Sequence, residues 1–235
     1  MLTEHTYKPF DEELESMRAR VLEMGGLVEE QLNSAMSALM EGNQDQAQLV
    51  IENEAKVNAF EASSDQACTN IIALRCPTAG DLRMVLTILR TITDLERIGD
   101  EAVKIARYAL NMHNGDRISM PRHTEIRYLA ELATRMLRQS LNAFARVELA
   151  GIPDLARQDL TVDEEYHLIV RHLITYMMED PRTISSCIDL LFVAKAIERV
   201  GDHAKNIAEY VVYMVTGADV RHSSIEELEH EVRQA

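Results

Sequence analysis

Two short stretches organise this chain, because both carry the same pattern of charged, aliphatic and glycine residues. The first reads Asp94-Leu95-Glu96-Arg97-Ile98-Gly99-Asp100, and the second reads Ala196-Ile197-Glu198-Arg199-Val200-Gly201-Asp202. The two stretches are 102 residues apart (198 minus 96), and the match continues beyond them. Ala102, Ile105, Ala106 and Tyr108 recur as Ala204, Ile207, Ala208 and Tyr210. The repetition favours two halves that share a fold.

Each stretch places a Glu and an Asp four residues apart. On a helix this spacing puts both carboxylates on one face, about one turn apart. Two like charges at this spacing repel by roughly 0.2–0.5 kcal/mol on an exposed helix. The same unfavourable pair of like charges occurs at matched positions of both halves, which suggests that a cation lies between the carboxylates.

Composition limits the function classes. The chain has 235 residues, of which 46% are hydrophobic and 27% are charged, with few Gly and Pro residues. Such a composition is typical of a globular, helix-rich protein. The formal net charge is −15, which disfavours direct binding to nucleic acid and to anionic lipid, because both need clustered Lys and Arg.

Cysteine use and the N-terminal residues indicate the compartment. The three cysteines, Cys68, Cys76 and Cys187, form no CxxC pair, which fits a reducing environment. Residues 1–9 carry no basic region followed by an apolar run, so they do not resemble a secretory signal. The longest apolar run, residues 210–215, is far shorter than the roughly 18 residues of a membrane span. We expect a cytoplasmic protein.

Apolar periodicity and Gly/Pro punctuation predict six long helices and no sheet. The expected helices cover about residues 10–40, 45–75, 78–111, 124–149, 154–178 and 180–216. Residues 111–123 contain Asn114-Gly115-Asp116 and Pro121 and form the predicted domain boundary. The prediction is an all-α protein of two tandem, sequence-related three-helix bundles, residues 1–115 and 116–218. A C-terminal tail, residues 219–235, carries a short acidic amphipathic segment.

The helical period also predicts where the repeated carboxylates lie. Ile88, Ile92, Leu95 and Ala102 cluster on one side and should face the core. Glu96 and Asp100 fall on the shoulder of that stripe, and Glu198 and Asp202 lie similarly. Gly99 and Gly201 lie between the carboxylates, where a mid-helix glycine indicates a closely packed backbone or space for an ion.

Further oxygen ligands should come from the second helix of each half. One candidate pair is Glu54 and Asn58, and the other is Asp163 and His167. The two helices open similarly, with Asp45-Gln-Ala and Asp154-Leu-Ala, 109 residues apart (154 minus 45). That spacing aligns Glu54 with Asp163 and Asn58 with His167. An oxygen-liganded metal needs more than two carboxylates, so each bundle would pair its second helix with its third.

The repeated Glu-Arg-aliphatic-Gly-Asp motif, the duplicated three-helix pattern and the segment Pro77-Thr78-Ala79-Gly80-Asp81-Leu82-Arg83 resemble the PhoU family. The resemblance covers about residues 10–221. It implies two tandem three-helix bundles with Glu/Asp-xxx-Asp motifs that bind iron, zinc, manganese or magnesium. It also implies a cytosolic negative regulator of the phosphate-starvation response. Such regulators contact the histidine kinase PhoR and the transporter ATPase PstB, often as dimers.

The motif residues transfer to this chain one by one. Glu96, Asp100, Glu198 and Asp202 match the family motif fully. Glu54 and Asp163 match its first position, whereas Asn58 and His167 stand where an acid is expected. Each departure removes a charge, and His167 would favour a transition metal over magnesium.

Two alternatives remain open. A metal-free helical adaptor would have the same partners, with the acidic pairs solvated and engaged in helical ion pairs, Arg97 with Glu101 and Asp100 with Lys104. A di-iron carboxylate oxidoreductase needs two Glu-x-x-His motifs in a four-helix core, and the chain offers one, Glu164 to His167. Since no nucleophile–base pair or Gly-rich phosphate loop occurs, we expect no enzyme activity.

Overall fold

The computed structural model describes residues 8–113 and 123–235. Most of the predicted domain boundary and the first seven residues lie outside the described residues. Within the described part there are seven α-helices, one 3₁₀ turn and no strand. The helices are α1 (Lys8–Glu41), α2 (Gln44–Arg75), α3 (Ala79–His113), α4 (His123–Arg146), α5 (Ile152–Glu179), α6 (Ile184–Thr216) and α7 (Ile225–Gln234). The all-α prediction is confirmed, and no helix in this part of the chain is both long and apolar enough to cross a bilayer.

The helix ends follow local chemistry. The side chain of Asn43 accepts a hydrogen bond from the Gln46 amide and caps α2, and Gly217 ends α6 with a φ of 85°. Asp180 was expected to open the sixth helix directly. Instead it caps a 3₁₀ turn, Pro181–Thr183, that precedes α6, a common way for a helix to tighten at its end.

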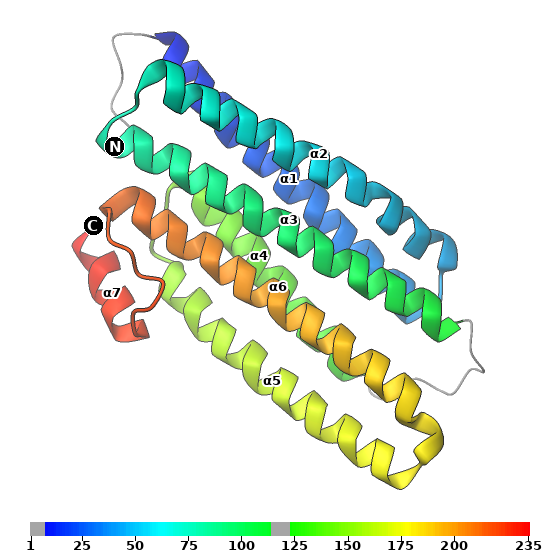
Figure 1. The fold of residues 1–235 in the computed structure, drawn as a ribbon. Helices are drawn as coiled ribbons and strands as arrows, with labels where there is room; N and C mark the ends of the chain where they lie inside the picture. The colour runs from blue at the N-terminus through cyan, green and yellow to red at the C-terminus, as the bar shows by residue number, and fades with distance from the viewer. Residues whose placement is uncertain (1–7, 114–122) are drawn as a thin grey trace.

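The six long helices form two layers (Figure 1). Helices α2, α3, α6 and α5 lie side by side in this order, and α1 and α4 lie behind them. Each half of the chain is one three-helix bundle, α1–α3 and α4–α6, and α3 packs on α6 where the bundles meet. Helix α7 packs on α5 near the C-terminus, where Leu228 is buried.

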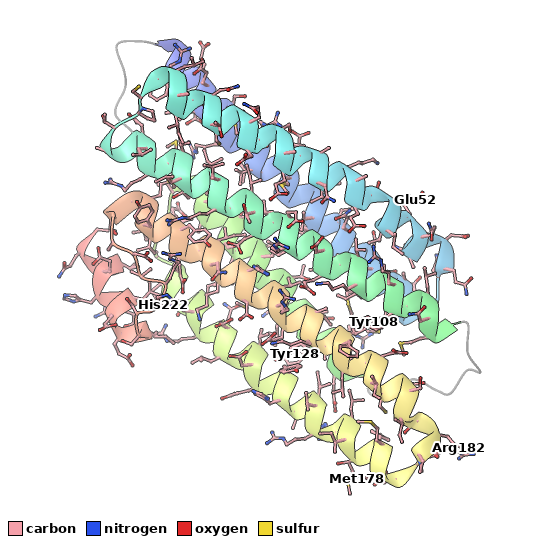
Figure 2. All side chains as sticks on the ribbon, viewed as in Figure 1. Glu52, Tyr108, Tyr128, Met178, Arg182 and His222 are labelled. Atoms are coloured by element: carbon pink, nitrogen blue, oxygen red, sulfur yellow. The ribbon has the colours of Figure 1, made fainter. Side chains whose placement is uncertain are left out.

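Helices α3 and α6 run antiparallel in the middle of the front layer. Near one end, the Thr87 hydroxyl donates to the Tyr210 carbonyl at 3.3 Å. Near the other end, the rings of Tyr108 and Phe192 stack with centroids 5.6 Å apart; Figure 2 labels Tyr108 on α3 beside α6. The two repeated motifs are thus carried by the two central helices, at the junction of the halves.

The side chains packed against the two repeated glycines show which residues of α2 correspond to which residues of α5. A Cβ built on Gly99 would lie 3.3 Å from Val57, and one on Gly201 would lie 3.3 Å from Val162. Val57 therefore corresponds to Val162, 105 residues later (162 minus 57). The buried residues agree: Ala47, Val50, Val57, Ser64 and Cys68 on α2 correspond to Ile152, Leu155, Val162, Ile169 and Leu173 on α5.

This register corrects the alignment of α2 with α5. The spacing is 105 residues and not 109, so Glu54 corresponds to Asp159 and Asn58 corresponds to Asp163. The earlier alignment was wrong because it matched the polar first turns of the two helices. The buried side chains that contact the motif helix set the register, since a shift of four residues would change every contact with Gly201.

Candidate functional site

Four carboxylates gather where α2 faces α3, and we call Glu54, Glu61, Glu96 and Asp100 the α2/α3 cluster. The Glu96 side chain is 13% exposed and that of Asp100 is 28% exposed, which confirms the predicted shoulder position. Partial burial raises the pKa of Glu96, and the charges of Asp100, Glu61 and Glu54 raise it further, against the opposing effect of Arg97. The cluster therefore disfavours its own full ionisation.

One oxygen in this cluster lacks a hydrogen bond. Glu96 Oε2 is buried and has no hydrogen-bond partner among the described residues, although the Arg97 Nε lies 3.4 Å away. The adjacent Gln31 is 3% exposed, and neither polar atom of its amide has a partner there. Gln31 Oε1 lies 3.5 Å from the position of a Cβ on Gly99. Buried polar atoms of this kind are costly without a ligand or water.

The corresponding α5/α6 cluster consists of Asp159, Asp163, Glu198 and Asp202. Here the acids have direct partners: Lys195 Nζ donates to both Glu198 oxygens, at 2.6 and 2.5 Å, and Lys205 Nζ donates to Asp159 at 2.8 Å. The pKa of Asp202 is raised to about 6, mainly by partial burial and to a smaller extent by the charges of Glu198 and Asp159. Partial burial, followed by the charge of Asp159, also raises the pKa of Asp163.

The structure places the predicted site residues in these two clusters, with two qualifications. The side chains of Asn58 and His167 are exposed, and His167 is close enough to Asp163 to favour the charged carboxylate. Two members were missed: Glu61, which follows Glu54 by two helical turns, and Asp159, one turn before Asp163. The spacing of buried residues on α2 and α5 would have found Asp159.

Neither cluster is a closed metal site as it stands. Among the residues that the structure describes, no three His, Cys, Asp or Glu side chains come together in an arrangement that could hold a metal. The donor chemistry of the α2/α3 cluster nevertheless suits a cation, since the cluster combines four acids with the buried, unbonded Glu96 oxygen. The α5/α6 cluster does not fit one in the same way, because ammonium groups already contact its acids.

The ion pairs expected for a solvated helix face did not form as predicted. Arg97 contacts Glu96 and Asp100, at 3.4 and 3.7 Å, and Glu101 pairs with Lys104 and with Arg199 of α6, both at 2.9 Å. The Nδ1 of His203 on α6 lies 2.6 Å from a carboxylate oxygen of the buried Asp94 on α3, across the same junction. The motif helices thus use their charged residues to join the two bundles.

Comparison with known proteins identifies the family. The PhoU domain matches residues 21–109 and 126–211. The two matches start 105 residues apart (126 minus 21) and end 102 apart (211 minus 109), the same spacings that the packing shows. The chain is thus covered by two copies of one domain.

Curated relatives and solved structures match over nearly their whole length. The phosphate-specific transport system accessory protein PhoU of Escherichia coli (strain K12) is 45% identical over 228 residues, covering 97% of this chain and 94% of that protein. The PhoU homolog of Pseudomonas putida is 43% identical, covering 99% and 90%. The crystal structure of PhoU from Pseudomonas aeruginosa superposes with a TM-score of 0.85 at 43% identity, over 89% of this chain and all of that one.

A more distant structure has the same fold. The phosphate transport system regulatory protein PhoU from Streptococcus pneumoniae superposes with a TM-score of 0.82 at 29% identity, over 90% of this chain and 99% of that one. Both carboxylate clusters and the α3/α6 junction lie within the residues that the PhoU domain matches. The chain belongs to the PhoU family.

Proposed function

We propose that this protein is a cytoplasmic negative regulator of phosphate uptake and of the phosphate-starvation response. It would act by contact with the histidine kinase PhoR and the transporter ATPase PstB. The observation that carries the proposal is the match to proteins named phosphate-specific transport system accessory proteins, at 43–46% identity across at least 97% of this chain. Full-length likeness at this level supports a shared role more strongly than likeness of fold alone.

The α2/α3 cluster is the part of the protein that we propose to bind metal. Glu54, Glu61, Glu96 and Asp100 would hold the ion, and carboxylate oxygens suit magnesium, manganese or iron. A bound cation supplies positive charge where four acids meet. It would relieve their repulsion and join α2 to α3, which fixes the relative position of two helices of the front layer.

A phosphate-responsive reporter tests the regulatory role. In a bacterium that lacks its own PhoU protein, the reporter should be active even at high phosphate, and expression of this chain should restore repression. A chain ended after residue 113, which keeps only the first bundle, serves as the control and should not restore it. If the full chain is stably produced and repression does not return, the regulatory proposal is wrong.

Contact with partners is tested separately. The purified chain should bind the cytoplasmic part of the kinase and the ATPase in a pull-down with each partner alone. Light scattering of the same preparation gives the oligomeric state, for which we propose a homodimer. Binding to neither partner, by a chain that restores repression, would show that regulation uses another contact.

The two alternatives can be separated from this proposal. A metal-free adaptor would restore repression with no metal bound, as measured by elemental analysis of protein purified without a metal-affinity tag. A di-iron oxidoreductase is disfavoured by the site itself, because Glu164 and His167 are both exposed on α5. Ligands of a di-iron centre project into the core of a bundle.

A further inference from the structure

The two carboxylate clusters differ at the positions that surround the acids. On the motif helices, at a spacing of 102 residues, Lys195 stands where the first bundle has Thr93, and Lys205 stands where it has Val103. On the facing helices, at a spacing of 105, Tyr166 stands where the first bundle has Glu61. At these three positions the second bundle gains two cations and loses one acid. At two other matched positions the change is opposite, since Glu209 stands where the first bundle has Arg107 and Asp163 stands where it has Asn58.

Each of the two lysines contacts a buried acid of the α5/α6 cluster. The Lys195 ammonium contacts both oxygens of Glu198, whose side chain is only 10% exposed, and it also lies 5.4 Å from the ring centroid of Tyr166. An ammonium over an aromatic face is attracted by the ring quadrupole. Lys205 donates to Asp159, whose side chain is 6% exposed. The two buried acids of this cluster therefore each have an ammonium partner on α6.

The first bundle has looser cationic partners. Arg97 lies 3.4 Å from Glu96 and 3.7 Å from Asp100, and Arg107 lies 3.3 Å from Glu54. Both arginine side chains are more than half exposed, at 54% and 57%. Arg199, which matches Arg97, turns away from its own cluster to Glu101 of α3. Only the first bundle keeps a buried carboxylate oxygen without a hydrogen bond among the described residues.

We propose that the protein binds metal at one repeat only: Lys195 and Lys205 take the place of a metal ion in the α5/α6 cluster, and the α2/α3 cluster binds the metal. This inference rests on the metal-binding part of the proposed function. A metal ion entering the α5/α6 cluster would have to displace an ammonium group from a nearly buried carboxylate. The metal–carboxylate contact would then replace a charge-assisted hydrogen bond, so the net gain in binding free energy would be small.

Exchanging the matched residues provides the test. Wild-type full-length protein and three variants are stripped with a chelator and dialysed against Mn²⁺, Zn²⁺ or, without oxygen, Fe²⁺, and the bound metal per chain is measured by elemental analysis. K195T/K205V installs the residues of the first bundle and should bind roughly twofold more metal than wild type. E198Q/D202N should bind as much as wild type. T93K, which places an ammonium one turn before Glu96, should bind less.

The outcomes separate this inference from the metal proposal itself. If wild type binds metal and E198Q/D202N loses part of it, or if K195T/K205V gains none, the one-repeat inference is wrong and metal binding stands. If neither wild type nor K195T/K205V binds any of the three ions, both are wrong. Helical content by circular dichroism shows that each variant folds, and K195T alone, at an exposed position, replaces the double variant if that one does not. A metal-induced rise in the unfolding temperature is an independent readout, expected for wild type and lost in E96Q/D100N.

Discussion

Glu209 on α6 provides the most direct test of the electrostatics of the second bundle. Its side chain is almost completely buried, at 6% exposed. Burial raises the pKa of Glu209 from 4.5 to about 7, with Lys205 opposing the rise and Asp159 adding to it. We predict that Glu209→Gln, which keeps the shape and removes the charge, stabilises the protein at alkaline pH.

The size and sign follow from linkage. Below pH 4.5 the carboxyl is protonated in the folded and the unfolded chain alike, so the substitution changes little. As pH rises from 4.5 to about 7 the unfolded chain releases its proton first, and the free energy of unfolding of the wild type falls. The full loss, present above about pH 7, is about 3 kcal/mol at about 1.36 kcal/mol per pH unit. The attraction between Glu209 and Lys205 needs no separate correction, because it opposes the rise and is already included in the pKa of about 7.

Urea unfolding followed by circular dichroism at pH 4.5 and pH 8.5 measures the difference. The variant should exceed the wild type by up to about 3 kcal/mol at pH 8.5 and match it at pH 4.5. Glu164→Gln on the exposed face of α5 is the control and should shift stability by less than about 0.5 kcal/mol at either pH. A wild type that is as stable as Glu209→Gln at pH 8.5 would refute the assignment of a destabilising buried charge.

Four further substitutions test the packing, the junction and the first cluster. In urea unfolding, Gly26→Ala should raise the free energy of unfolding by about 1 kcal/mol, because no atom lies within 4 Å of the new Cβ. The new Cβ of Gly25→Ala would instead lie 2.7 Å from a side chain of α4. The Gly25→Ala variant should therefore be less stable than Gly26→Ala by about 1–3 kcal/mol. His203→Ala removes the 2.6 Å contact with buried Asp94 and should lower the free energy of unfolding by about 2–3 kcal/mol. A decrease below about 0.5 kcal/mol would contradict a structural role for this contact. In metal-free protein, Glu96→Gln should raise the unfolding temperature at pH 8 and not at pH 4, since burial and neighbouring acids raise the pKa of Glu96. An unchanged unfolding temperature at pH 8 would show that the charge of Glu96 does not destabilise the folded protein.

The sequence predicts the helices and the side on which the motif acids lie, because both depend on local periodicity. The 3.6-residue period puts Ile88, Ile92 and Leu95 in the core and Glu96 on its shoulder, and all four positions are observed. The closeness of the helices at Gly99 also follows, since a mid-helix glycine is unfavourable without a packing reason.

The register between α2 and α5 and the charge pairs across α3 and α6 could not be predicted in this way. Polar first turns are free to vary, so the opening Asp45 is a poor anchor, whereas the buried Val57 is fixed by its contact with Gly99. The pairs of Glu101 with Arg199 and of Asp94 with His203 join residues about 100 positions apart in the chain. These ion pairs depend on how the two bundles dock, which no local sequence pattern predicts.

The partner of the acid at matched positions 54 and 159 shows how the two bundles have diverged. In the first bundle Glu54 pairs with Arg107 at 3.3 Å, and in the second Asp159 pairs with Lys205 at 2.8 Å. At a spacing of 102, Arg107 corresponds to Glu209, so the cation has moved one turn back along the helix. An acid fills the place it left. Burial of Glu209 disfavours its charged form, and the attraction of Lys205, an ammonium already bound to Asp159, offsets only part of that effect.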